Sequence, residues 1–212
     1  TVSIENTVPV WRRGRGLGWL TAEYAILPGS TAPRKQRESS RGKRDGRSVE
    51  IGRLIGRALR SIVYFDTLGE NTLHVDCDVL QADGGTRTAC VTGAFVALAE
   101  ALALLKGSGR LEKIPLLDSV AAVSVGLVDA EPYLDLCYEE DARAEVDLNL
   151  AMTGKGLWVE IQGTAENEPF STEKMNAMIV LVMANSPKRG RCRVGRPGIT
   201  SGGSWMCGST GE

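Results

Sequence analysis

The sequence predicts an α+β fold in which helices pack against antiparallel sheet, and three observations lead to it. Four short segments with strand-like composition follow one another between residues 119 and 163, with brief turn sequences between them. Such short connections favour antiparallel neighbours. Elsewhere, apolar residues recur at helical spacing, and one apolar segment is too long for a strand. With 212 residues, 42% of them hydrophobic, the chain can bury a core.

The first predicted helix begins at Ser48 and carries one apolar face, because apolar residues recur at helical spacing from Ile51 to Val63. Ser48 is expected to cap this helix, and Glu50 suits its first turn. Arg47 then stands at the start of the helix, where the helix dipole favours an anion.

The second predicted helix follows a strand at residues 71–80 and the stretch DVLQADGGTRTAC, residues 78–90. It starts at about Thr86 and is apolar nearly all round, which predicts a central, buried helix. A third helix begins near Ser171. Beyond it the sequence is rich in glycine and loses its periodicity. We therefore expect one domain over residues 1–184, incomplete at its N-terminus, and a divergent, disordered tail over residues 185–212.

Composition excludes several classes of function. The formal net charge is −1, so no global attraction to nucleic acid or to an anionic membrane is expected. No run of about 18 apolar residues is present, which predicts no membrane span, and the first residues lack a signal-peptide pattern. Five cysteines form no CxxC pair, which favours a reduced, cytoplasmic protein. His74 is the only histidine, so a histidine-rich metal site is excluded and acid–base chemistry falls to carboxylates.

Gly84, Gly85, Thr86 and Arg87 form the first candidate site. Each glycine costs about 1 kcal/mol of helix propensity, so the pair needs a backbone reason. If the helix starts at Thr86, its free N–H groups, the threonine hydroxyl and the guanidinium all point at one place, which suits a phosphate. A sharp strand-to-helix turn without any ligand explains the same residues, and the spacing does not match a P-loop.

Charge is distributed unevenly along the chain. Residues 34–60 hold ten Lys/Arg and three Asp/Glu, whereas residues 129–147 hold eight Asp/Glu and one Arg. One basic and one acidic surface in a near-neutral protein suggest oriented chemistry on a polyanion, with the basic side attracting its phosphates. A solvated charged face is the alternative interpretation of the basic segment.

Carboxylates gather in the acidic segment. Glu145, Asp147 and Asn149 alternate with apolar residues, so they share one face of a predicted strand, and Asp141 lies in the turn before it. Carboxylates placed close together either bind a hard cation such as Mg²⁺ or share protons at shifted pKa values. A polar strand edge that faces solvent is the alternative.

Six stretches of the chain are long and specific enough to compare with known families: GWLTAEYAILP, RESSRGKRDGRSVEIGRLIGRALR, HVDCDVLQADGGTRTA, AAVSVGLV, YEEDARAEVDLNL and VEIQGTAENEPF. Together they resemble the ribonuclease PH family of phosphorolytic exoribonucleases, from the first residues to about residue 180. The resemblance implies the ribonuclease PH fold, which is ribosomal protein S5 domain 2-like. It also implies a homo-oligomer, a ring-shaped hexamer built as a trimer of dimers.

The resemblance further implies a phosphate-dependent 3′-to-5′ exoribonuclease that trims tRNA precursors and acts on other RNA 3′ ends. Inorganic phosphate is the implied co-substrate: it attacks the last phosphodiester, and a nucleoside diphosphate is released. Mg²⁺ is the implied cofactor. Because phosphate held in line is a sufficient nucleophile, no serine or histidine nucleophile is needed.

By position in these motifs, the resemblance implies phosphate-binding residues, catalytic residues that also hold the metal, and RNA-binding residues. The phosphate-binding residues are Arg47, Gly85, Thr86 and Arg87, the catalytic and metal-binding residues are Asp141 and Asp147, and the RNA-binding residues are Arg34 and Arg37. Gly29 departs from the family, which usually has arginine after the proline of LPGST, so one RNA contact is expected to be missing. The resemblance ends at about Met183.

Two alternatives remain open. One is a catalytically inactive, RNA-binding ring subunit of the same fold, which the basic segment and the altered ends of the chain suggest. Such a subunit is expected to lose the GGTR turn or the aspartates, and this chain keeps both. The other is a fragment that does not fold stably.

Overall fold

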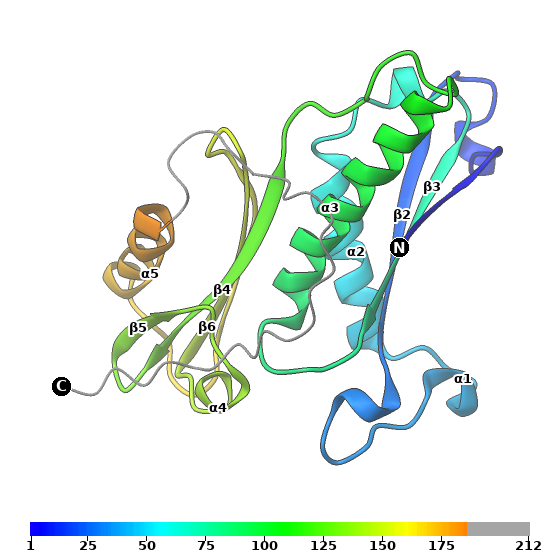
Figure 1. Cartoon of the computed structure of the whole chain (residues 1–212). Helices are drawn as coiled ribbons and strands as arrows, with labels where there is room; N and C mark the ends of the chain where they lie inside the picture. The colour runs from blue at the N-terminus through cyan, green and yellow to red at the C-terminus, as the bar shows by residue number, and fades with distance from the viewer. Residues whose placement is uncertain (186–212) are drawn as a thin grey trace, which may run out of the picture.

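The computed structural model describes residues 1–185, except for the side chains of residues 39 and 41. Residues 186–212, and with them nearly all of the predicted tail, lie outside the described residues. Two sheets and three long helices form four layers (Figure 1). The layers follow in this order: the first sheet, helices α2 (Gly46–Arg60) and α3 (Thr86–Gly107), the second sheet, and helix α5 (Thr172–Asn185).

The first sheet contains β1 (Val2–Glu5), β2 (Trp19–Ile26) and β3 (Thr72–Val79), in the order β1-β3-β2. β1 pairs with β3 antiparallel. β2 runs parallel to β3, with Tyr24 opposite Cys77. A parallel pair needs a crossover connection, and α2 lies in that connection. Within the described residues, this pair departs from the antiparallel pairing that the sequence predicts.

The second sheet contains β4 (Val120–Val128), β5 (Glu131–Leu134), β6 (Val146–Thr153) and β7 (Trp158–Ala165), in the order β5-β4-β6-β7. Each of its pairings is antiparallel, which confirms the prediction for this region and the α+β class. Because side chains alternate along a strand, Leu148 on β6 packs under α5 while its neighbours Asp147 and Asn149 face the α3 side.

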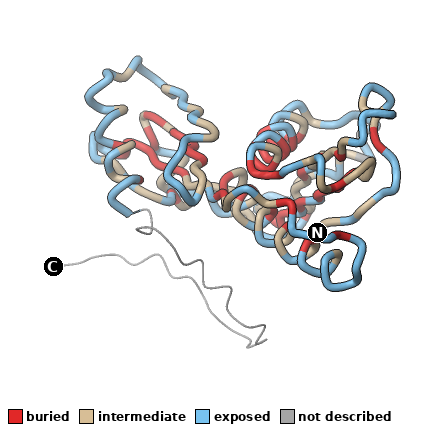
Figure 2. Tube along the Cα trace, turned by 90° about the horizontal axis from the view of Figure 1, so that it is seen from above, coloured by how far each residue is buried: buried red, intermediate tan, exposed pale blue. Residues whose placement is uncertain are grey.

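Short elements complete the described chain. They are the helices α1 (Glu38–Arg41) and α4 (Tyr138–Asp141) and the single-turn 3-10 helices Val10–Arg12, Pro28–Ser30 and Phe65–Leu68. Buried residues form two main groups (Figure 2). The larger one lies between the first sheet and helices α2 and α3, and includes Leu20, Ile55 and Leu98. The smaller one lies between the second sheet and α5, and includes Val125 and Met178.

Helix α2 begins before the position that the sequence predicts. Its N-cap is Asp45, whose side chain accepts a hydrogen bond from the backbone N–H of Arg47 at 3.4 Å. The prediction that Ser48 caps the helix was wrong, because Ser48 lies buried inside the first turn and its hydroxyl donates to the Glu38 carboxylate. Glu38 also accepts from the N–H of Asp45 at 3.2 Å, so the preceding loop supplies the polar partners at this end of the helix.

Helix α3 begins at Thr86 as predicted, but the expectation of a buried helix was wrong for one of its faces. Leu98 and Leu102 are fully buried, whereas Val96 is 43% and Leu104 is 75% exposed. By length and composition alone, α3 is also apolar enough to cross a membrane, contrary to our expectation that no segment is. A core helix of a soluble protein meets the same criterion, and α3 packs between two sheets, so this composition is weak evidence for a span.

The Gly84–Gly85 turn, which precedes α3, packs directly against the segment between β5 and α4. That segment belongs to the half of the molecule that contains the second sheet. Both glycines have positive φ, +62° and +47°, where other residues are strained. A Cβ atom at Gly84 would lie 2.3 Å from the carbonyl oxygen of Leu136 and 2.8 Å from the carbonyl carbon of Cys137. The backbone N–H of Tyr138 donates to the Asp83 carboxylate at 2.9 Å. The turn and the segment before α4 are therefore fixed together.

Gly84→Ala is expected to lower the free energy of unfolding by about 1–3 kcal/mol for the backbone strain, with a further loss from the displaced 136–137 backbone. The matched control is Gly93→Ala on α3, where a Cβ meets nothing within 4 Å and φ is ordinary. Alanine there should raise the free energy of unfolding by up to about 1 kcal/mol. Denaturant unfolding measures both variants, and equal stability of the two would contradict the role given to this turn.

Candidate active site

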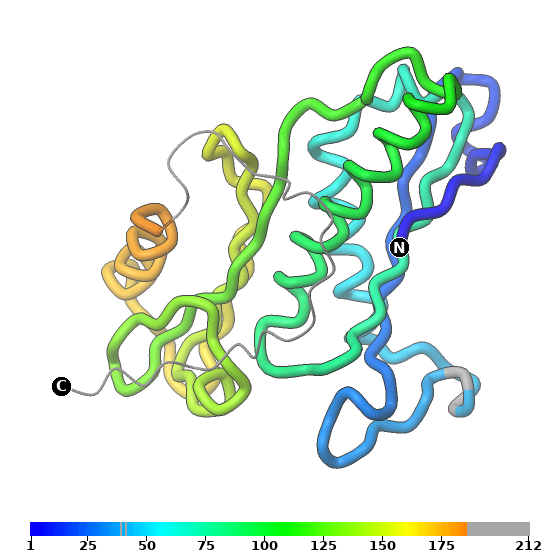
Figure 3. Tube along the Cα trace, viewed as in Figure 1, coloured from blue at the N-terminus to red at the C-terminus, as the bar shows by residue number. Residues whose placement is uncertain are grey.

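The candidate residues come from the ends of several elements that meet at one end of the molecule. The start of α2, the start of α3, and the α4–β6 connection all lie there, together with the loop that follows β2 (Figure 3). Hydrogen bonds join the start of α3 to β2, through Thr86 and Tyr24, and the turn before α3 to α4. Ion pairs join α2 to the start of α3, through Glu50 and Arg87, and to the loop that follows β2.

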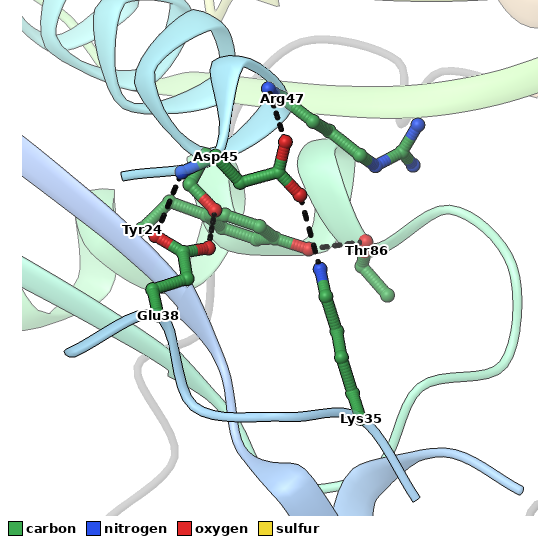
Figure 4. A network of polar contacts seen from close by, with 7 residues as sticks. Tyr24, Lys35, Glu38, Asp45, Arg47 and Thr86 are labelled. Atoms are coloured by element: carbon green, nitrogen blue, oxygen red, sulfur yellow. Dashed lines mark hydrogen bonds and ion pairs between the residues drawn. The ribbon is translucent and has the colours of Figure 1, made fainter. Parts of the chain in front are cut away.

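Thr86 is held by Tyr24 of β2. The Tyr24 hydroxyl and the Thr86 hydroxyl are 2.8 Å apart and hydrogen-bonded (Figure 4). Burial raises the pKa of Tyr24, and the Thr86 hydrogen bond and the positive charges of Arg47 and Arg87 oppose this rise. Both arginines therefore act on one hydroxyl group, which places their positive charges around the first turn of α3.

Within the described residues, no side chain caps the N-terminus of α3, because the residue at that position is Gly85. The first N–H groups of a helix have no partner inside the helix, and the helix dipole makes this end positive. An anion near Thr86 would therefore meet free N–H donors, the Thr86 hydroxyl, and the charges of Arg47 and Arg87. This arrangement can hold a phosphate, whereas the close packing of Gly84 against residues 136–137 requires that glycine with or without a ligand.

Arg87 is held in place from two sides. One of its terminal nitrogens, Nη1, donates to the side-chain oxygen of Gln162 on β7 at 3.2 Å and lies 3.9 Å from the Glu50 carboxylate on α2. Gln162 in turn donates to the same Glu50 oxygen at 2.8 Å. The Arg87 side chain is 17% exposed, so its position is set by packing as well as by these partners.

Asp147 carries a buried oxygen atom without a partner. Its Oδ2 accepts from the side-chain amide of Asn149 at 3.0 Å, whereas Oδ1 is buried and makes no hydrogen bond in the described structure. Burial raises the pKa of Asp147, the Asn149 hydrogen bond and the Arg87 charge oppose the rise, and the negative charges of Asp141 and Glu166 add to it. A buried, unpaired carboxylate oxygen is costly unless a ligand or cation satisfies it.

The acidic residues fit a magnesium ion that keeps most of its water. Asp141 ends α4 and lies near enough to Asp147 to raise its pKa. Among the described residues, no group of three or more His, Cys, Asp or Glu side chains could hold a metal ion together. Mg²⁺ commonly binds through one or two carboxylates together with waters and substrate phosphates, so two aspartates and one unpaired oxygen are sufficient.

Arg34 and Arg37 lie apart from this cluster. Both are exposed in the loop before α1, and in the described part of the chain neither makes a hydrogen bond or an ion pair. The loop is nonetheless anchored beside the start of α2, because Lys35 between them contacts the Asp45 carboxylate at 3.4 Å (Figure 4). Gly29 lies in the short 3-10 helix at the start of the same loop.

Sequence reasoning missed Tyr24, Lys35 and Gln162 as parts of the site. Tyr24 and Gln162 are single residues within strands, and no spacing pattern distinguishes them from other strand residues. The β6–β7 register places Gln162 opposite Asn149, which makes it a neighbour of both Asp147 and Arg87. Only the long-range pairing of strands reveals such contacts.

Comparison with known proteins is consistent with this geometry. Residues 1–103 match domain 1 of the 3′ exoribonuclease family, RNase PH, and residues 118–181 match domain 2. The chain belongs to this family. The two matches correspond to the first sheet with α2 and α3, and to the second sheet with most of α5. Whether residues 1–184 behave as a single domain stays a prediction.

Solved structures with this fold include exosome proteins. Rice (Oryza sativa) Rrp46 is 19% identical with a TM-score of 0.59, over 86% of this chain and 75% of that chain. A chain of the Archaeoglobus fulgidus exosome with RNA bound to the active site is 18% identical, with a TM-score of 0.68, over 85% and 72%. A chain of an archaeal exosome core is 16% identical, with a TM-score of 0.65, over 85% and 70%. At these identities the likeness shows the ribonuclease PH-like fold.

Asp147→Asn is expected to raise the melting temperature at neutral pH without divalent cations, because the native state no longer buries a charge. The folded-state pKa of Asp147 lies above its unfolded value. Wild type therefore gains stability as pH falls through the folded pKa towards about 4, and the two melting temperatures should converge.

Melting curves at a series of pH values measure this effect. The matched control is Glu168→Gln, which removes the same charge from an exposed loop position and should change little at any pH. If Asp147→Asn melted below wild type at neutral pH without cations, the buried carboxylate would not carry the cost assigned to it.

Proposed function

We propose that the chain is a phosphate-dependent 3′-to-5′ exoribonuclease that trims the 3′ ends of tRNA precursors and releases nucleoside diphosphates. Its membership of the 3′ exoribonuclease family supports the class of reaction. One local observation carries the proposal: Arg87, next to Thr86 at the start of α3, donates a hydrogen bond to Gln162 on β7. Gln162 lies opposite Asn149, and Asn149 donates to the buried Asp147 carboxylate. Groups suited to bind the attacking phosphate therefore lie next to groups suited to bind a cation.

In the proposed reaction, an oxygen of inorganic phosphate attacks the phosphorus of the last phosphodiester. The bond from that phosphorus to the 3′ oxygen of the preceding nucleotide breaks. The last nucleotide leaves as a nucleoside diphosphate, and the shortened RNA ends in a 3′ hydroxyl group. No protein nucleophile takes part, so the rate depends on positioning and on neutralising charge.

Arg47, Arg87 and the start of α3 hold the attacking phosphate in this proposal. Arg87 is already oriented by Gln162 and Glu50, so little side-chain freedom remains to be lost on binding. Gly85 has no side chain to cover the first N–H groups of α3, and the Thr86 hydroxyl lies beside them. Arg47 is exposed at the start of α2, where it can reach a bound anion.

Asp141 and Asp147 are the residues that would hold Mg²⁺. The unpaired Oδ1 of Asp147 supports this assignment, because a cation is the partner that a buried, ionised oxygen lacks. The ion would supply positive charge beside the phosphodiester under attack. Asn149 holds the other oxygen of Asp147 and so fixes the direction of Oδ1.

Arg34 and Arg37 contact the RNA strand in this proposal. Their exposed loop is anchored next to Arg47 through the Lys35–Asp45 contact, so the strand would approach the phosphate site along a basic surface. Such binding weakens as salt concentration rises. With glycine at position 29, one arginine contact that the family usually makes is missing, so RNA affinity depends more on these two residues.

A catalytically inactive RNA-binding ring subunit is the second candidate. The exposed basic loop that carries Arg34 and Arg37 favours it, because that loop would bind RNA whether or not catalysis follows. Both candidates share a ring assembly, which we propose to be a homohexamer built from dimers. RNA binding without any phosphate-dependent product would favour the inactive subunit.

Arg87→Ala is expected to lower phosphate-dependent release of nucleoside diphosphates by roughly 10²–10³, as loss of one charge-stabilising donor does in other enzymes. RNA affinity should largely survive, because Arg34 and Arg37 are intact. The assay uses an RNA with extra nucleotides beyond a CCA end, with Mg²⁺, and resolves the products with and without phosphate.

The matched control is Arg110→Ala, which removes the same charge just beyond the other end of α3, where the Arg110 guanidinium donates a hydrogen bond to the Asn6 side chain. Its turnover should equal that of wild type. Unchanged turnover in Arg87→Ala would reject the phosphate site.

A further inference from the structure

Two cysteines that are distant in the sequence lie next to each other beside the candidate phosphate site. Cys77 lies on β3 and is buried, and Cys90 lies in the second turn of α3 and is half-buried. The Cys77 thiol donates a hydrogen bond to the backbone carbonyl oxygen of Cys90 at 4.0 Å, which places the Cys77 sulfur beside that residue. The two cysteines do not form a CxxC motif. They lie together because α3 packs on the first sheet.

Small molecules can reach the pair. Cys77 and Cys90 both line a surface cavity of about 490 Å³ between the end of β3 and the first turns of α3. Thr86 and Gly84 line the same cavity, so it extends along the turn that precedes the helix. A small oxidant that enters the cavity therefore reaches both cysteines and the candidate phosphate-binding turn.

The two thiols differ in reactivity. The hydrogen bond from the Cys90 thiol lowers the pKa of Cys77, although burial and the neighbouring carboxylates of Asp76 and Asp78 oppose this shift. The same hydrogen bond, together with burial, raises the pKa of Cys90. Cys77 is therefore the thiol that ionises first, and a thiolate is the form that reacts with peroxides.

We propose that Cys77 and Cys90 are an oxidative modification site, at which a hydroperoxide converts the two thiols into a reversible disulfide. The Cys77 thiolate attacks the terminal peroxide oxygen, the O–O bond breaks, and an alcohol or water leaves after taking up a proton. Cys77 is then a sulfenic acid. The Cys90 sulfur attacks the Cys77 sulfur, the S–O bond breaks, and the hydroxyl leaves as water with the Cys90 proton. Two thiols are oxidised by two electrons and one peroxide is reduced.

The disulfide would act on the phosphate-binding turn, and this part of the inference rests on the proposed function. It closes a ring around residues 78–89, which include Gly84–Arg87. Tyr24, which is hydrogen-bonded to Thr86, lies opposite Cys77 in the β2–β3 ladder. A bond that draws Cys90 towards β3 moves the first turn of α3 relative to Tyr24, so phosphate affinity falls.

The first test is chemical and does not depend on activity. A full-length variant in which Cys137, Cys192 and Cys207 are changed to serine is treated with hydrogen peroxide and mapped by mass spectrometry. The expected result is a linked peptide pair that contains Cys77 and Cys90 and disappears on reduction with dithiothreitol. The matched control adds Cys90→Ser, and Cys77 should then stop at a sulfenic acid that dimedone traps.

If no link forms although both cysteines react with a small alkylating reagent, or if trapped sulfenic acid accumulates equally with and without Cys90, the proposal is overturned.

The second test measures equilibrium binding of inorganic phosphate by calorimetry in the reduced and oxidised variant. The dissociation constant is expected to rise several-fold on oxidation and to return on reduction. An unchanged constant overturns the coupling to the turn. If neither form binds phosphate, the proposed function is wrong. The mass spectrometry of the first test then still shows whether the disulfide forms.

Discussion

The close packing of the Gly84–Gly85 turn against the backbone of residues 136–137 is the contact on which the candidate site depends. A side chain at Gly84 has no room there, and the positive φ of both glycines lets the chain enter α3 immediately afterwards. The start of α3, which belongs to one half of the molecule, is thereby placed beside α4 and β6 of the other half. Arg87 and Asp147 act on each other because these two halves meet at this turn.

Charge at the site is arranged at a cost to stability. Asp147 is buried near a second carboxylate and has an oxygen without a partner, and Arg87 is held between α2 and β7 instead of pairing with it directly. Such groups lower the stability of the free protein and are satisfied when a ligand of opposite charge binds. A phosphate near Arg87 and a cation near Asp147 would relieve both costs together, which explains why a chain would keep this arrangement.

The sequence predicts the positions of the helices and strands better than the contacts between them. The start of α3, the second sheet and the start of α5 follow from periodicity and turn composition, because these depend on neighbouring residues. The N-cap of α2 was misplaced because Ser48 and Asp45 are both good caps, and the Glu38 side chain, which engages Ser48 from the preceding loop, decides between them. The exposed face of α3 could not be predicted, since composition does not tell which side of an apolar helix is covered.

The candidate site, too, is predicted from the sequence only in part. Arg47, Arg87 and the two aspartates were identified by motifs, and the structure brings charges from all of them to bear on Tyr24 or Asp147. The residues that orient them were missed, because the pairing of β6 with β7 places Gln162 and the contact of β2 with the start of α3 places Tyr24. The contact of Cys77 with Cys90 has the same origin, and the sequence gives no sign of it.

In the proposed mechanism inorganic phosphate itself attacks the RNA, and labelled phosphate tests this step most directly. The protein is incubated with unlabelled RNA, Mg²⁺ and radiolabelled inorganic phosphate, and the nucleotide products are separated. The label should appear in nucleoside diphosphates, in an amount equal to the nucleotides removed, because the attacking phosphate becomes their terminal phosphate. Unlabelled nucleoside monophosphates as the only products would mean that water is the nucleophile, and would contradict the phosphorolytic mechanism.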